Sequence, residues 1–168
     1  MGAVYTKTSD GKDLRRLLRE EERGHLMTAY YDEHHKRLEQ MVDEAIEAHK
    51  ASLIVDCHSF PSIPLPCDQN QEVPRPDFCI GTDAYHTPPA LVDMLLGAIR
   101  KEGFTVKVNK PYAGTMVPMN RYRRDARVQS VMIEVNRKLY LHEGAGEKTK
   151  GFEQTRCLVA GLLHLMQQ

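Results

Sequence analysis

Short apolar segments alternate with helix-forming segments along the 168 residues of this chain. The strongest of them, VQSVMIEV at Val128–Val135, is rich in β-branched residues and predicts a buried strand. Shorter runs of the same kind predict strands at Leu53–Val55, in DFCIGTD and in FTVKVN. Strands that alternate with helices typically form a parallel sheet covered by those helices. The pattern therefore predicts an α/β fold with a mostly parallel or mixed central sheet flanked by helices.

Three regions predict helices. In Leu14–Lys50, apolar residues recur at every third or fourth position, which indicates one long helix or two helices with a break at Gly24. Ala90–Arg100 and Gly151–Gln168 have the same periodicity. Between the first two predicted strands, Pro61–Pro76 contains five prolines. We expect a long loop there, and such loops are often functional.

The composition excludes several classes of protein. Lys and Arg number 23 and Asp and Glu number 23, so the chain lacks the excess of basic residues that is typical of nucleic-acid-binding proteins. No apolar run is long enough to cross a bilayer, and the first residues lack the apolar core of a signal peptide. The spacing of the four cysteines fits neither a zinc knuckle nor a disulfide scaffold. We therefore expect a single domain, residues 1–168, with reduced thiols in the cytoplasm.

Chemically capable residues come at the ends of three predicted strands. In chain order they are Asp56 with His58, Asn109, and Glu134 with Asn136 and Arg137. In open α/β sheets, sites form beyond the carboxyl ends of the strands. We therefore expect these residues to converge on one crevice.

Two histidines are candidate metal ligands. His58 follows a predicted strand, where its ring can bind zinc while Asp56 orients it. A single histidine is not a metal site, so a hydrogen-bonded loop histidine is the alternative. His86 precedes a predicted helix, where it is either a polar anchor or part of a site.

Glu134 lies inside an apolar strand, where an ionised carboxylate is costly to bury. Desolvation would raise its pKa toward the range of a general base, and an ion pair with Arg137 is the alternative. NKPYAGT, with Gly114 and Thr115, is either an anion-binding turn or a plain turn. RYRRDAR, with Arg121 and Arg127, is suited to carboxylate recognition or is a solvated loop.

Six segments follow the order found in the N-formylglutamate amidohydrolase family. They are GAVYTKTSDGKDLR, YYDEHHKRL, DCHSFPS, PDFCIGTDAYHTP, VNKPYAGTMVP and MIEVNRKLY. The chain resembles this family over nearly its whole length. The family is similar to zinc carboxypeptidase-like and aspartoacylase-like hydrolases. It hydrolyses N-formyl-L-glutamate to formate and glutamate, late in histidine breakdown.

The resemblance implies a Zn²⁺ cofactor with His58 as a ligand, and Glu134 as the catalytic acid/base. Zinc would activate water and polarise the formyl carbonyl, and Glu134 would move the proton to the leaving amine. The implied partner is a small-molecule N-acyl amino acid. Candidates to bind its carboxylates are Asn109, Gly114, Thr115, Arg127, Arg137 and Arg121.

The sequence lacks the family's N-terminal segment, which carries a P-H-S-G-type motif and resembles the source of the other zinc ligands. Asp56 and His86 are candidates to replace them, as are His35 and Asp83. We expect the sheet edge left uncovered to pair with another chain, which favours a homodimer. The alternative function is a non-catalytic family member that keeps the fold and a small-anion pocket.

Overall fold

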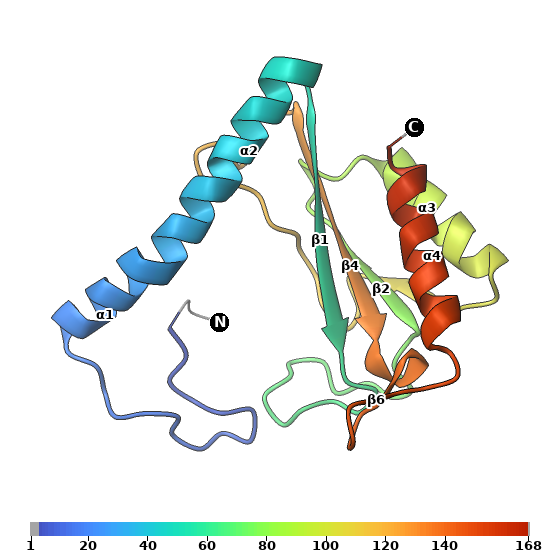
Figure 1. The fold of residues 1–168 in the computed structure, drawn as a ribbon, viewed down its shortest axis with the longest axis horizontal. Helices are drawn as coiled ribbons and strands as arrows, with labels where there is room; N and C mark the ends of the chain where they lie inside the picture. The colour runs from blue at the N-terminus through green and yellow to red at the C-terminus, as the bar shows by residue number, and fades with distance from the viewer. Residues whose placement is uncertain (1–3, 168) are drawn as a thin grey trace.

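The computed structural model describes residues 4–167, which form a helical arm, a four-stranded sheet and two helices against that sheet (Figure 1). The elements are α1 (Glu20–Leu26), a π-helical segment η1 (Met27–Asp32), α2 (Glu33–His49), β1 (Ser52–Phe60), β2 (Phe78–Gly81), α3 (Pro89–Lys101), β3 (Val106–Val108), β4 (Val128–Asn136), a 3₁₀ turn η2 (Arg137–Leu139), β5 (Leu141–His142), β6 (Glu147–Lys148) and α4 (Phe152–Leu165).

The central sheet is mixed, with strand order β1-β4-β2-β3. β1 is parallel to β4 and β2 is parallel to β3, but β2 is antiparallel to β4. β5 and β6 form a separate two-stranded hairpin. The predicted α/β fold with a mixed sheet and flanking helices is therefore confirmed.

The main core lies between the sheet and the helices α3 and α4. Every second residue of β4, at Val131, Ile133 and Val135, packs into it. The helices contribute the buried residues Leu95, Ile99, Leu158 and Leu162. The alternate β4 residues point to the opposite face, because side chains of a strand alternate between faces. Glu134 therefore lies on the face of the sheet that α3 and α4 do not cover. We call this face the polar face.

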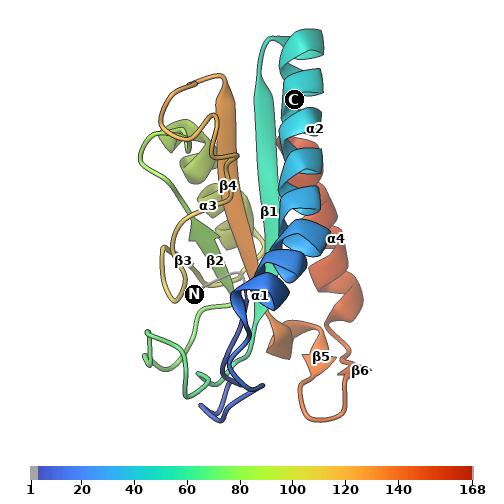
Figure 2. The same ribbon diagram turned by 90° about the vertical axis from the view of Figure 1, so that its left-hand side faces the viewer.

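The predicted N-terminal helix begins at Glu20 and continues to His49 through a π-helical segment. Gly24 lies inside α1 and does not break it. α1 and η1 contain no buried residue, whereas α2 packs Val42 and Ile46 against Val128 of β4. Figures 1 and 2 show that this arm diverges from the sheet toward α1. No helix within residues 4–167 combines the length and the hydrophobicity that a membrane span requires.

β1 is longer than the sequence indicated. The apolar pattern predicted Leu53–Val55 only, with Asp56 and His58 beyond the strand, but the strand runs from Ser52 to Phe60. It extends because each residue of β1 up to Phe60 pairs with a residue of β4. Asp56 and His58 are thus strand residues, which fixes the direction of their side chains.

Candidate active site

A row of three side chains crosses the polar face of the sheet. His58 of β1 is the direct partner of Glu134 of β4, and Glu134 is also the partner of Cys79 of β2. Directly opposite residues project to the same face, with Cβ atoms about 5 Å apart. The pairing therefore brings an imidazole and a thiol to either side of the Glu134 carboxylate.

Glu134 is 7% exposed, and its Oε2 atom has no hydrogen-bond partner within residues 4–167. Burial raises the pKa of its carboxyl above the usual value. The positive charges of His58, Arg137 and Arg75 oppose that rise in pKa, and the negative charge of Asp56 adds to it. A buried carboxyl group with one free oxygen and a raised pKa can exchange a proton closer to neutral pH.

Asp56 and His58 form a pair on the same face. The Nε2 atom of His58 lies 2.7 Å from Oδ1 of Asp56. The imidazole is 49% exposed and the Asp56 carboxylate 17%, so the pair lies at the solvent boundary beside Glu134. This contact fixes the orientation of the His58 ring relative to Asp56.

Arg137 lies beyond the end of β4, in the 3₁₀ turn. Its guanidinium donates to Ser59 on β1, from Nε to Oγ at 3.2 Å and from Nη2 to the carbonyl at 3.1 Å. Within the described residues, Arg137 therefore does not form the direct ion pair with Glu134 that was the alternative prediction. Arg137 affects Glu134 through its charge, which lowers the carboxyl pKa.

Arg75 is a site residue that the sequence did not indicate. It is 4% exposed and its Nη2 atom pairs with Asp68 at 2.6 Å. The guanidinium lies beside the rings of Phe60 and Tyr112, at 5.9 and 5.6 Å from their centroids. Its Nε atom is buried without a partner among the described residues. No local pattern in the proline-rich loop distinguishes this arginine.

Asn109, Gly114 and Thr115 are held by contacts of their own. The Asn109 amide bonds Thr82 twice, through Oδ1 at 2.9 Å and Nδ2 at 2.8 Å. The Thr115 hydroxyl lies 2.6 Å from the Ser130 hydroxyl. Gly114 has φ +90°, and its carbonyl lies against Gly81. These contacts order the segment after β3, and they leave the Asn109 amide and the Thr115 hydroxyl engaged with the protein itself.

Arg127 and His86 lie at the other end of β4. Arg127 pairs with Asp125 just before the strand begins, roughly 20 Å along it from Glu134. His86 is 1% exposed, with Nδ1 2.7 Å from the Val128 carbonyl and Nε2 accepting from the Arg123 amide at 2.8 Å. Both ring nitrogens of His86 are therefore used, as in a polar anchor. Neither residue is brought to the row that contains Glu134.

The fit of a zinc ion can be judged from the ligands present. A catalytic zinc typically has three protein ligands. Within residues 4–167, no group of three or more His, Cys, Asp and Glu side chains is arranged to hold a metal ion. His58 and Asp56 supply two groups of the right chemistry, and they are bonded to each other. The described residues alone do not make a zinc site.

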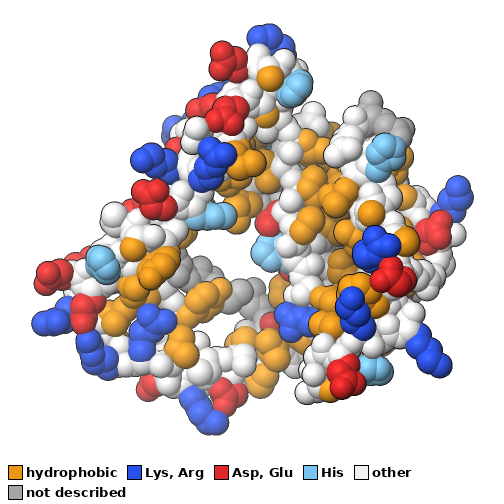
Figure 3. Space-filling view, viewed as in Figure 1, with side chains coloured by type: hydrophobic (Ala, Val, Ile, Leu, Met, Phe, Trp, Pro, Cys, Tyr) orange, Lys and Arg blue, Asp and Glu red, His pale blue; other side chains and the backbone are white. Residues whose placement is uncertain are grey.

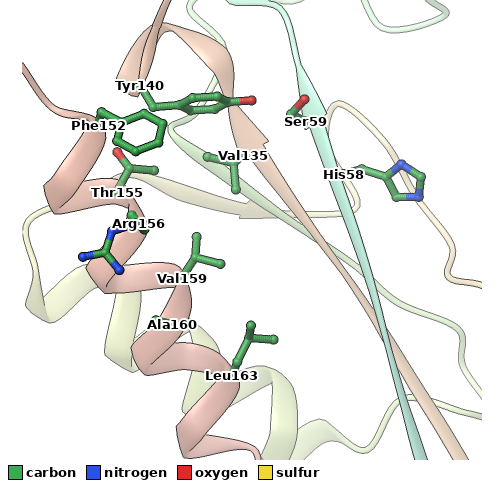
Figure 4. A pocket seen from close by; sticks show the side chains of 10 residues that line it. All are labelled: His58, Ser59, Val135, Tyr140, Phe152, Thr155, Arg156, Val159, Ala160 and Leu163. Carbon is green, nitrogen blue, oxygen red and sulfur yellow. The ribbon is translucent and has the colours of Figure 1, made fainter. Parts of the chain in front are cut away.

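A cavity of about 380 Å³ lies between β1 and α4. Apolar residues of α4 and its surroundings dominate its walls, including Phe152, Val159 and Leu163. His58 is among the residues that line this cavity. Figure 4 shows its ring on the far side of β1 from the side chains of α4, so the imidazole points away from the cavity. Glu134 does not line it, which separates this apolar groove from the row on the polar face.

Comparisons with known proteins support the resemblance seen in the sequence. A structure of N-formylglutamate amidohydrolase from Ralstonia eutropha JMP134 is 29% identical and superposes with a TM-score of 0.78, covering 94% of this chain and 57% of that protein. A gene product from Agrobacterium tumefaciens, Atu2144, shares the fold at 21% identity, with a TM-score of 0.65 and coverage of 98% and 63%. This chain thus spans less than two thirds of either protein. No curated protein sequence matches it significantly.

The sequence model of one protein family, described as N-formylglutamate amidohydrolase, matches residues 1–141. That match includes β1, β2, β3 and β4 and all residues of the row around Glu134. A match over most of the 168 residues shows that this chain belongs to the N-formylglutamate amidohydrolase family.

Proposed function

We propose that this chain hydrolyses the amide bond of N-formyl-L-glutamate or a related N-acyl amino acid, with Glu134 as the general base. The observation that carries the proposal is the buried Oε2 atom of Glu134, which lacks a partner among the described residues and belongs to a carboxyl group of raised pKa. Family membership supports amide hydrolysis as the reaction class.

The reaction uses one water molecule and returns the proton to the product. Glu134 takes a proton from water as the water oxygen attacks the formyl carbon. Glu134 then gives that proton to the departing nitrogen as the carbon–nitrogen bond breaks, so formate and glutamate are formed and the carboxylate is regenerated. The pair of Asp56 and His58 borders this carboxylate and fixes the imidazole beside the reacting group.

The substrate carries negative charge, and arginines near Glu134 suit it. Arg137 directly follows the end of β4, and we propose that its guanidinium binds a carboxylate of the substrate. Asn109, Gly114 and Thr115 remain proposed contacts, on the segment that follows β3. Arg127 remains a proposal too, although it would need to act from the opposite end of the strand.

Zinc remains a proposal for His58 alone. His58 would be one ligand of a site that takes its other ligands from outside residues 4–167, because those residues contain no group of three. The same observation favours one alternative function, a non-catalytic family member that keeps the fold. We therefore assign no step of the reaction to a metal.

The test is formate release from N-formyl-L-glutamate by the purified chain, with added zinc and with a chelator in parallel. Glu134→Gln should lower the rate by about 10²-fold or more, because it removes the general base. Glu147→Gln, a change of the same kind at an exposed residue of β6, should leave the rate unchanged. A folded chain that releases no formate from any N-acyl amino acid would favour the non-catalytic alternative.

A further inference from the structure

Cys79 completes the row of three side chains on the polar face. It is the partner of Glu134 on β2, so it lies on the side of that carboxylate opposite His58. In the view of Figure 3, hydrophobic side chains gather on the surface toward α4, on the other face of the sheet. Cys79 is 0% exposed and its contacts form inside the protein, so they do not depend on what covers that surface.

The thiol of Cys79 has a single proton, and that proton goes to a backbone carbonyl. Its Sγ atom lies 3.2 Å from the carbonyl oxygen of Tyr112, to which it donates. Burial raises the pKa of the Cys79 thiol above the usual value. Hydrogen bonds with the backbone of Tyr112 and Lys110 oppose that rise in pKa, and the negative charge of Glu134 adds to it. The thiol therefore keeps its proton at neutral pH and remains a donor.

The segment that accepts this hydrogen bond lies against the β2 side of the row. At one end, the Asn109 amide donates to the Ile80 carbonyl at 2.8 Å. At the other end, the Thr115 hydroxyl contacts Ser130 of β4. Between these two ends, within residues 4–167, no residue other than Cys79 forms a hydrogen bond with the backbone of residues 110–114. Cys79 is therefore the hydrogen-bonded anchor for the middle of the segment.

We propose that Cys79 is a positioning residue of the active site, whose thiol holds the backbone of residues 110–114 beside Glu134 and gives no hydrogen bond to that carboxylate. The Oε2 atom of Glu134 is buried and has no partner among the described residues, as expected beside a thiol whose only proton goes elsewhere. Gly114, a proposed substrate contact, belongs to the anchored segment, so Cys79 acts on substrate binding through that segment. The inference rests on the proposed function, with Glu134 as the general base.

The first experiment observes the thiol directly and needs no enzymatic activity. It uses a variant in which Cys79 is the only cysteine. The other three are exposed and are replaced by serine: Cys57, Cys67 and Cys157. The infrared S–H stretching band of Cys79 should lie at a lower frequency than that of an exposed thiol, because a hydrogen bond to a carbonyl weakens the S–H bond. Glu134→Gln in the same variant should leave the band at that lower frequency, since the proton goes to Tyr112.

The second experiment separates the hydrogen bond from the volume of the sulfur atom. Cys79→Ser and Cys79→Ala both remove the sulfur, and only serine keeps a donor. Hydrogen–deuterium exchange of residues 109–116, measured by mass spectrometry, should become about fivefold faster in Cys79→Ala, as for one lost hydrogen bond, and stay near the wild-type rate in Cys79→Ser. Cys157→Ala, at an exposed position of α4, is the matched control and should change nothing. Circular dichroism checks that each variant is folded.

The third experiment separates substrate binding from chemistry with the same variants. In formate release from N-formyl-L-glutamate, Cys79→Ala should raise KM about fivefold and change kcat by less than about twofold, because the anchored segment is loosened and Glu134 is not altered. Cys79→Ser should restore KM. A wild-type chain that releases no formate would overturn the proposed reaction, and with it the effect on KM. The thiol band and the exchange rates would still decide whether Cys79 anchors the segment.

Three outcomes would overturn the role proposed for Cys79. The first is an S–H band at the frequency of an exposed thiol. The second is a band that Glu134→Gln moves to that frequency, which would show that the thiol donates to Glu134 instead of to Tyr112. The third is equal exchange of residues 109–116 in Cys79→Ser and Cys79→Ala, which would show that the volume of the sulfur, and not its proton, holds the segment.

Discussion

His58 and Glu134 are direct partners in the parallel pairing of β1 and β4. Asp56 lies on the same face and contacts His58 at 2.7 Å. Two neighbours of opposite charge, His58 and Asp56, therefore act on the buried Glu134 carboxyl from the same side. Burial raises its pKa, positive charge on His58 lowers it, and the charge of Asp56 raises it. The balance among these three effects sets when Glu134 can accept a proton.

Single substitutions at the two neighbours should shift the pKa of Glu134 in opposite directions. His58→Gln removes the positive neighbour and should raise that pKa, whereas Asp56→Asn removes the negative neighbour and should lower it. The measurement is a pH titration of the Glu134 carboxyl carbon by NMR, assigned with Glu134→Gln. Shifts in the same direction for both variants would contradict this account of the site.

Glu134 should cost the protein stability at neutral pH. Because its folded-state pKa is raised above the usual value of 4.5, the carboxyl stabilises the fold only while protonated, and stability is lost as pH rises from that value through the folded pKa. Glu134→Gln keeps a neutral group in place. We expect this variant to be about 1 kcal/mol more stable than wild type at pH 7 and to lose that advantage below pH 4.5.

Urea unfolding at a series of pH values measures this difference. Glu147→Gln, on the exposed hairpin strand β6, is the matched control and should follow the wild-type curve throughout. A Glu134→Gln variant that is less stable than wild type at pH 7 would show that the carboxylate has a partner that stabilises its charged form.

The sequence contained most of the fold because its strands and helices have strong local patterns. VQSVMIEV predicted β4 to within one residue, because most of its buried positions are β-branched or apolar. β1 was predicted too short because polar residues interrupt its apolar pattern at Asp56. The pairing that extends it comes from β4, more than seventy residues away, and no local pattern reports it.

The candidate site was predictable only in part, for the same reason. Glu134 and His58 could be named from their places in the chain and from the family resemblance. Arg75 could not, because its burial depends on Asp68, Tyr112 and Phe60, which come from three separate segments. Cys79 joins the row only through the antiparallel register of β2 with β4. Contacts between distant segments decide which polar residues share a site.

The Asp68–Arg75 pair should hold the 61–76 loop in place. Hydrogen bonds from the Leu65 amide and from Arg75 outweigh desolvation and lower the pKa of Asp68 below 3.8. Asp68→Asn leaves the buried guanidinium without its countercharge and should cost about 3 kcal/mol at pH 7. Because the folded pKa is lowered, this stabilisation is present above pH 3.8 and is lost as pH falls through the folded pKa.

Two measurements check the prediction for Asp68. Urea unfolding at pH 7 gives the change in stability, and limited proteolysis shows whether cleavage begins within residues 61–76. Glu72→Gln is the matched control on the same loop, because within residues 4–167 the Glu72 carboxylate forms ion pairs only with the exposed lysines Lys107 and Lys110. It should change neither result. Equal effects of the two variants would mean that burial of the Arg75 pair contributes nothing to the loop.

Gly81 should tolerate no side chain, unlike the glycines of the helices. It is the last residue of β2 and the partner of Met132, which lies two residues before Glu134 on β4. A Cβ atom at Gly81 would collide with the Gly114 carbonyl and with the Met132 side chain, and the carbonyl cannot move without shifting the segment after β3. Gly81→Ala should therefore destabilise the protein by about 2 kcal/mol or more. Gly97→Ala in α3 meets nothing within 4 Å and should stabilise it by about 0.5–1 kcal/mol. Thermal unfolding of the two variants tests this contrast, and a neutral Gly81→Ala would show that the Gly114 segment is free to move away from the sheet.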